Sequence, residues 1–84
     1  MALILIVDDS PTEVHVMKKA LEGGGYRTAV AGNGQEGVRL AREMHPDLIF
    51  MDIVMPGMNG YQATRALVND PDTSRIPIVM VTSK

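Results

Sequence analysis

Residues 3–13 read Leu-Ile-Leu-Ile-Val-Asp-Asp-Ser-Pro-Thr-Glu, and this stretch decides the fold of the 84-residue chain. Its first five residues form an apolar run of strand length, as expected of a strand that is buried on both faces of a sheet. Ser10 and Glu13 then have the spacing of a capping box, and Pro11 stands at the first helical position. The stretch therefore predicts a buried strand that leads through two acidic residues into a helix.

The same alternation of strand and helix continues along the chain. Further strands are predicted at residues 26–31, 48–51 and 76–81, and further helices at residues 33–44 and 59–69. Each of these two helices begins at an asparagine that has Glu36 or Gln62 three residues later. In the helix at residues 33–44 we expect Val38, Ala41 and Met44 to face the core. The pattern is typical of a parallel sheet with helices on its faces.

Composition and charge exclude several classes of function. The formal net charge is −2 and no basic tract is present, so we do not expect this segment to bind nucleic acid. There is no cysteine, which excludes disulfides and thiolate metal sites. The apolar start lacks the basic region of a signal peptide, and no apolar run approaches the about 20 residues that a membrane span needs. We therefore expect a soluble, cytoplasmic protein with no membrane contact.

Three acids stand at the predicted carboxyl ends of strands. Asp8 and Asp9 follow the first strand, and Asp52 follows the third. If the second and third strands pair on opposite sides of the first, the order of strands reverses between the first and third, where ligands bind in open parallel sheets. Clustered carboxylates repel each other, and a hard cation such as Mg²⁺ offsets that repulsion. A carboxylate beside such an ion can attack phosphorus, and the Thr82 hydroxyl, at the end of the fourth strand, could donate a hydrogen bond to a phosphoryl oxygen.

Each of these residues also fits a purely structural role. Asp8 and Asp9 could cap the following helix and favour its positive end. Asp52 could be an ordinary turn residue, and Thr82 alone is uninformative. The joint placement of the three acids at one edge of the sheet favours the functional interpretation.

Longer motifs resemble the receiver domains of two-component signalling, and the resemblance covers the whole chain. It is carried by residues 5–10 (Leu-Ile-Val-Asp-Asp-Ser), 51–60 (Met-Asp-Ile-Val-Met-Pro-Gly-Met-Asn-Gly) and 76–82 (Ile-Pro-Ile-Val-Met-Val-Thr). Residues 10–13 and 60–65 further resemble the stand-alone regulators of type IV pilus twitching motility. The resemblance implies a flavodoxin-like α/β fold with a parallel sheet in the order 2-1-3-4. It also implies a role in controlling twitching motility or chemotaxis.

The resemblance implies a role for each matching residue. Asp52 would be the phosphoacceptor and would take its phosphoryl group from a histidine kinase or its phosphotransfer domain. Asp9, Asp52 and the backbone carbonyl of Val54 would bind Mg²⁺ directly, and Asp8 would act through coordinated water. Thr82 would move toward the phosphoryl group. Val54 would also influence loss of that group, and its apolar side chain cannot orient an attacking water.

The sequence departs from the family after the fourth predicted strand. The family continues with a helix, a strand that carries a phosphoryl-contacting lysine, and a final helix, and Lys84 does not match that lysine. Residues 1–84 therefore correspond to the N-terminal (βα)₃β portion of a receiver domain. We expect the fourth strand to be a sheet edge and one sheet face to lie partly bare, with Leu3, Leu5, Ile49 and Met51 incompletely covered. From this we expect a homodimer through the fourth strand or the uncovered face.

Two other functions remain open at this point. One is a phosphatase of the haloacid-dehalogenase type, an enzyme that also uses an aspartate after a strand together with Mg²⁺. That class needs a second acid two residues later, and Val54 stands there instead, so we expect a phosphoacceptor rather than an enzyme. The other is a truncated fragment that folds or dimerises without competent phosphosignalling.

Overall fold

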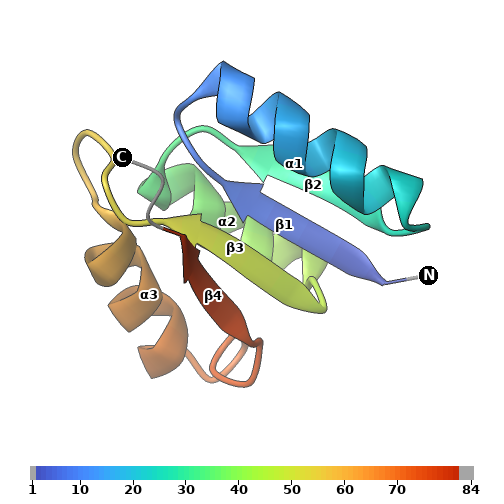
Figure 1. The fold of residues 1–84 in the computed structure, drawn as a ribbon. Helices are drawn as coiled ribbons and strands as arrows, with labels where there is room; N and C mark the ends of the chain where they lie inside the picture. The colour runs from blue at the N-terminus through green and yellow to red at the C-terminus, as the bar shows by residue number, and fades with distance from the viewer. Residues whose placement is uncertain (1, 82–84) are drawn as a thin grey trace.

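The computed structural model describes residues 2–81, and strands and helices alternate along this part of the chain (Figure 1). In chain order the elements are β1 (Leu3–Val7), α1 (Pro11–Gly23), β2 (Arg27–Ala31), α2 (Gly34–Met44), β3 (Leu48–Asp52), α3 (Gly60–Asn69) and β4 (Ile78–Val81). The predicted elements are therefore all present, with boundaries that shift by at most two residues. None of the helices among these residues is long and apolar enough to cross a membrane.

The strands form one parallel sheet in the order β2-β1-β3-β4, as the resemblance implied. Strand β1 lies between β2 and β3, so the order reverses at β1 and the carboxyl ends of β1 and β3 are neighbours. Helix α1 lies over β1 and β2 on one face, and α2 and α3 lie on the other face (Figure 1). This is the arrangement that places a ligand crevice beyond the ends of β1 and β3.

Side-chain caps fix where the helices begin. The Asn59 and Gln62 side chains accept hydrogen bonds from each other's backbone N–H at 2.9 and 3.0 Å, a complete capping box for α3. At α2 the Asn33 side chain accepts from the Glu36 N–H at 2.8 Å. At α1 the Ser10 hydroxyl accepts from the Glu13 N–H at 3.5 Å, which is one half of the predicted box. The helix starts predicted from local spacing are confirmed.

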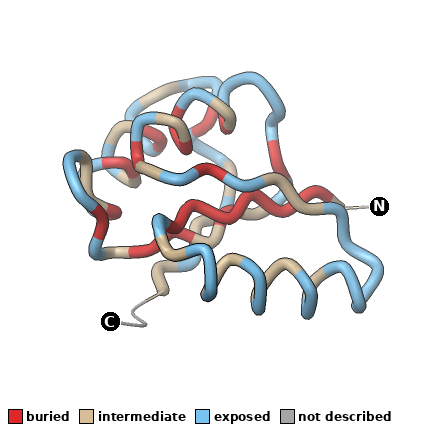
Figure 2. Tube along the Cα trace, turned by 90° about the horizontal axis from the view of Figure 1, so that it is seen from above, coloured by how far each residue is buried: buried red, intermediate tan, exposed pale blue. Residues whose placement is uncertain are grey.

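The main core lies between the sheet and the pair of helices α2 and α3. Its strand residues include Leu5, Ile49 and Met51, which are fully buried, and Leu3 is buried as well. Figure 2 shows the buried residues concentrated along the central strands and on this side of the sheet. The prediction that these four residues are partly bare is wrong, because their positions in the strand direct them to the face that two helices cover.

The less covered surface lies on the opposite face, over strands other than β1 and β2, on which α1 packs. Ile4 and Ile6 are buried there, but the side chains farther from α1 are not: Phe50 is half-buried and Val79 is 43% exposed. Helix α1 itself contributes no fully buried residue (Figure 2). An incompletely covered face is thus present, but over β3 and β4 and formed by other residues than those expected.

One residue of α2 also departs from expectation. Val38 and Ala41 are buried, whereas Met44 is 42% exposed. Met44 is the last residue of the helix, and the chain turns away at His45, which adopts a left-handed conformation with φ 48°. The prediction that Met44 faces the core is therefore wrong, because Met44 lies at the end of the helix, where the chain turns away.

Candidate functional site

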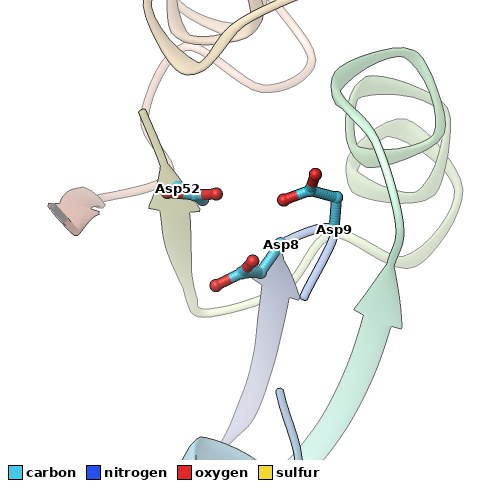
Figure 3. A group of neighbouring side chains, drawn as sticks. All are labelled: Asp8, Asp9 and Asp52. Atoms are coloured by element: carbon cyan, nitrogen blue, oxygen red, sulfur yellow. The ribbon is translucent and has the colours of Figure 1, made fainter. Parts of the chain in front are cut away.

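The three predicted acids lie together at the carboxyl edge of the sheet (Figure 3). Asp8, Asp9 and Asp52 each offer a carboxylate oxygen, and these oxygens lie within 4.8 Å of one another. Asp8 and Asp52 are 4% and 2% exposed, and Asp9 is exposed to solvent. The site therefore has two buried carboxylates and a third at its mouth.

Backbone hydrogen bonds set the positions of Asp8 and Asp52. The Asp8 N–H donates to the Ala31 carbonyl at 3.0 Å, which extends the pairing of β1 with β2 by one residue. Asp52 is the last residue of β3, and the following Ile53 N–H donates to the Val81 carbonyl at 3.3 Å. Both acids are thus carried by the rigid sheet rather than by a mobile loop, as a preorganised site requires.

Asp8 also has the structural role that the sequence left open. Its Oδ1 accepts a hydrogen bond from the Ser10 N–H at 2.9 Å, just before α1 begins. This contact holds the turn from β1 into α1 and orients the Asp8 carboxylate. The structural and functional interpretations of Asp8 are therefore compatible.

Two grooves flank the acids, one on each side of the first turns of α1. A groove of about 410 Å³ between α1 and β2 is lined by Asp8, Asp9, His15 and Lys18, among others. A second groove, of about 230 Å³, is lined by Asp8, Glu13, Val16 and Val81, among others. His15 and Lys18 were not predicted to lie beside the acids, because their proximity depends on how α1 packs over β2.

The remaining predicted residues are only partly placed. Val54 lies two residues after Asp52 in the loop that leads to α3, and its side chain is 57% exposed. Thr82 and Lys84 lie outside the described residues. The arrangement of Asp8, Asp9 and Asp52 thus stands on the observed geometry, whereas the roles of Val54 and Thr82 remain predictions.

The donor set fits a hard divalent cation. Carboxylate oxygens are the ligands that Mg²⁺ prefers, and Mg²⁺ is usually held by one or two carboxylates together with water. A cation between the oxygens of Asp8, Asp9 and Asp52 would offset their mutual repulsion, which is strongest for the two buried groups. Because Asp9 is exposed, such an ion could keep several of its waters.

Comparison with known proteins agrees with this geometry. Residues 4–84 match the family model of the response regulator receiver domain. The chain is 56% identical to Protein PilH of Pseudomonas aeruginosa over 84 residues, which covers 100% of this chain and 69% of PilH. It is 43% identical to the DNA-binding response regulator MtrA of Mycolicibacterium smegmatis over 81 residues, which is 96% of this chain and 34% of MtrA.

Solved structures show the same fold. The N-terminal domain of a response regulator receiver protein from Methanoculleus marisnigri superposes with a TM-score of 0.96 at 40% identity, covering 100% of this chain and 68% of that one. The receiver domain of the sensor histidine kinase PA1611 from Pseudomonas aeruginosa superposes with a TM-score of 0.94 at 34% identity, covering 99% and 68%. That structure has a magnesium ion coordinated in its active site cleft. The chain belongs to the response regulator receiver domain family of two-component signalling.

Proposed function

We propose that residues 1–84 act as a receiver unit that accepts a phosphoryl group on Asp52. The observation that carries this proposal is the convergence of Asp52 with Asp8 and Asp9, whose carboxylate oxygens lie within 4.8 Å of one another at the sheet edge. Asp52 is the candidate acceptor because it ends the central strand β3 and is nearly fully buried. Asp8 also holds the turn from β1 into α1, where its Oδ1 accepts the Ser10 N–H.

The transfer is a simple exchange of bonds at phosphorus. A carboxylate oxygen of Asp52 attacks the phosphorus of a phosphohistidine, and the phosphorus–nitrogen bond breaks as the new phosphorus–oxygen bond forms. The electron pair of the broken bond stays on the imidazole nitrogen, so the imidazole leaves neutral when its other nitrogen carries a proton. The products are an acyl phosphate on Asp52 and a free histidine on the donor.

Mg²⁺ is the cofactor that the donor set supports. Asp9, Asp52 and the Val54 carbonyl would hold it directly, and Asp8 would act through coordinated water. When bound, the ion supplies charge neutralisation for both the carboxylates and the phosphoryl oxygens. The Thr82 hydroxyl is proposed to respond to the phosphoryl group. The magnesium ion in the cleft of the PA1611 receiver domain supports this assignment.

The proposed donor is a histidine kinase or its phosphotransfer domain, and the proposed location is the cytoplasm, where the ATP that such kinases consume is made. The match to PilH supports the narrower resemblance to twitching-motility regulators, and a role in twitching motility or chemotaxis is proposed on that ground. Asp52 acts in this scheme as an acceptor rather than as a phosphatase. A second copy of the chain is a further proposed partner.

Labelling by a small phosphodonor tests the proposal. The chain is incubated with phosphoramidate and Mg²⁺, and intact-mass measurement follows the addition of one phosphoryl group. We expect the wild type and the control variant Asp72→Asn to be labelled, and Asp52→Asn and wild type with a chelator not to be. Release of the label by hydroxylamine would identify an acyl phosphate. Equal labelling of Asp52→Asn, or no labelling of a folded wild type, would refute Asp52 as the acceptor.

A further inference from the structure

The loop between β3 and α3 carries Val54, whose carbonyl is a proposed ligand of Mg²⁺. Two contacts hold the first half of this loop. The Ile53 carbonyl accepts a hydrogen bond from the Gly60 N–H at 3.0 Å. The Met55 side chain is buried in the core. The start of the loop is therefore fixed by the first residue of α3 and by the core.

The second half of the loop lies against the start of α2. A Cβ at Gly34, the first residue of α2, would stand 2.6 Å from the Met58 carbonyl oxygen. The same Cβ would stand 3.0 Å from the Met58 Cγ and 3.1 Å from its Cβ. The backbone of Gly34 thus contacts Met58 so closely that even a methyl group does not fit between them. The first turn of α2 is a support for the loop that follows the candidate phosphoacceptor.

The Met58 carbonyl has little freedom to move toward α3. It belongs to the same peptide unit as the Asn59 N–H, which donates to the Gln62 side chain at 3.0 Å in the capping box of α3. Because a peptide unit is planar, a push on its oxygen also moves its N–H. A push from α2 that leaves this cap intact is therefore taken up on the other side of Met58, by residues 54–57.

Helix α2 is itself fixed against β1. A Cβ at Gly37, three residues after Gly34, would stand 2.8 Å from the Val7 Cγ2. Val7 is fully buried and is the last residue of β1, directly before Asp8 and Asp9. Protein interiors are close-packed, so α2 has no room to approach β1 any further. The helix therefore sets the spacing between the end of β1 and the β3–α3 loop.

We propose that Gly34 is a positioning residue of the candidate site. Its bare backbone sets how closely the β3–α3 loop approaches the end of β1, and thereby where the Val54 carbonyl stands relative to Asp9. Gly34 acts through Met58 and not by contact with the ion. Mg²⁺ demands near-ideal octahedral geometry, so a small displacement of one ligand lowers its affinity. The inference rests on the proposed function, because the Val54 carbonyl is a ligand only in that scheme.

NMR of the chain without Mg²⁺ tests the mechanical part of the inference. Backbone amide shifts are compared for the wild type, Gly34→Ala and the control Ala41→Gly. Ala41 is a fully buried residue two turns further along α2, and its replacement weakens the helix without a clash. We expect the Val54 and Met55 signals to move in Gly34→Ala and to stay in place in Ala41→Gly. Unmoved signals in a folded Gly34→Ala would overturn the proposal, whether or not the chain binds Mg²⁺.

Mg²⁺ titration of the same amide signals tests the effect on the site. Gly34→Ala should raise the Mg²⁺ dissociation constant at least about tenfold, the usual effect of losing a group that orients a metal ligand. Ala41→Gly should leave the constant within about twofold of the wild type, since it is far from the loop. Equal constants for the wild type and Gly34→Ala would overturn this inference and leave the proposed function intact. A wild type that binds no Mg²⁺ would refute the metal site of the proposed function, on which the loop signals do not depend.

Met58→Ala tests the contact from its other side, should Gly34→Ala fail to fold. This variant removes the Cγ that lies nearest to Gly34 and leaves the backbone of the loop unchanged. We expect it to move the Val54 signal and to raise the Mg²⁺ dissociation constant, by less than the tenfold or so of the crowded variant. A Val54 signal and a dissociation constant that both match the wild type would overturn the role of this contact.

Discussion

The Cα of Gly60 lies so close to Asp52 that a Cβ at position 60 would stand 2.2 Å from the Asp52 carbonyl oxygen. The first residue of α3 thus packs directly on the backbone that carries the candidate phosphoacceptor. The Gly60 N–H also donates to the Ile53 carbonyl at 3.0 Å, which ties the helix to the end of β3. The backbone contact between the start of α3 and the end of β3 therefore leaves no room for a side chain at position 60.

Gly60→Ala should displace the end of β3 and destabilise the fold. A methyl group cannot fit against fixed backbone atoms, and overpacking of this kind costs about 1–3 kcal/mol of unfolding free energy. Gly23→Ala is the matched control, because a Cβ there meets nothing within 4 Å. Urea denaturation should show a clear loss for Gly60→Ala and little change or a small gain for Gly23→Ala. Equal stability of the two variants would contradict the close contact.

The convergence of the acids could be predicted because it follows from local signals. Asp8, Asp9 and Asp52 each end an apolar run, and the ends of neighbouring parallel strands necessarily meet. The helix starts were equally local, since a cap and its partner are three residues apart. For such features the sequence carries most of the information.

Features that depend on how elements pack could not be predicted. The bare sheet face was assigned to Leu5 and Ile49, but a strand buried on both faces gives no alternation of polarity to show which side chains face the two helices. The contact of Gly60 with Asp52 joins two elements across a loop. The grooves beside α1 likewise depend on the packing of that helix over β2.

Mg²⁺ should stabilise the chain through the acids. A ligand that binds only the folded state at ten times its dissociation constant adds about 1.4 kcal/mol to the unfolding free energy. Asp9→Asn should abolish most of this gain, because it removes a proposed direct ligand at the exposed mouth of the site. Asp72→Asn, in the turn after α3, should retain it. Thermal melts with and without Mg²⁺ provide the measurement, and an equal gain in all three proteins would rule out a site at Asp9.

Val54→Asn should shorten the lifetime of a phosphoryl group on Asp52. The Val54 side chain is 57% exposed two residues after the acceptor, so a replacement there can reach an attacking water without disturbing the core. An amide can orient water but is not a strong base, so we expect an acceleration of about tenfold at most, below the range of true general-base catalysis. Val68→Asn, at an exposed position on α3, is the control. Decay of the label followed by mass spectrometry should be fast only for Val54→Asn.

Acidification should weaken the ion pair between Arg42 of α2 and Asp70 at the end of α3. The pKa of Asp70 is held below its ordinary value by the Asp72 N–H, which donates to Oδ1 at 2.9 Å, and by the Arg42 guanidinium. The pKa of Asp70 is thus lower in the folded than in the unfolded chain. The charged carboxylate therefore stabilises the fold fully at pH values above its ordinary pKa of 3.8. This stabilisation is lost as the pH falls through the folded-state pKa.

The variant Asp70→Asn should keep the contact with the Asp72 N–H but lose the ion pair with Arg42. It should therefore melt below the wild type at pH 7, and the difference should vanish once the pH is well below 3.8. A difference that stays constant down to that acidity would show that the charge of Asp70 contributes nothing.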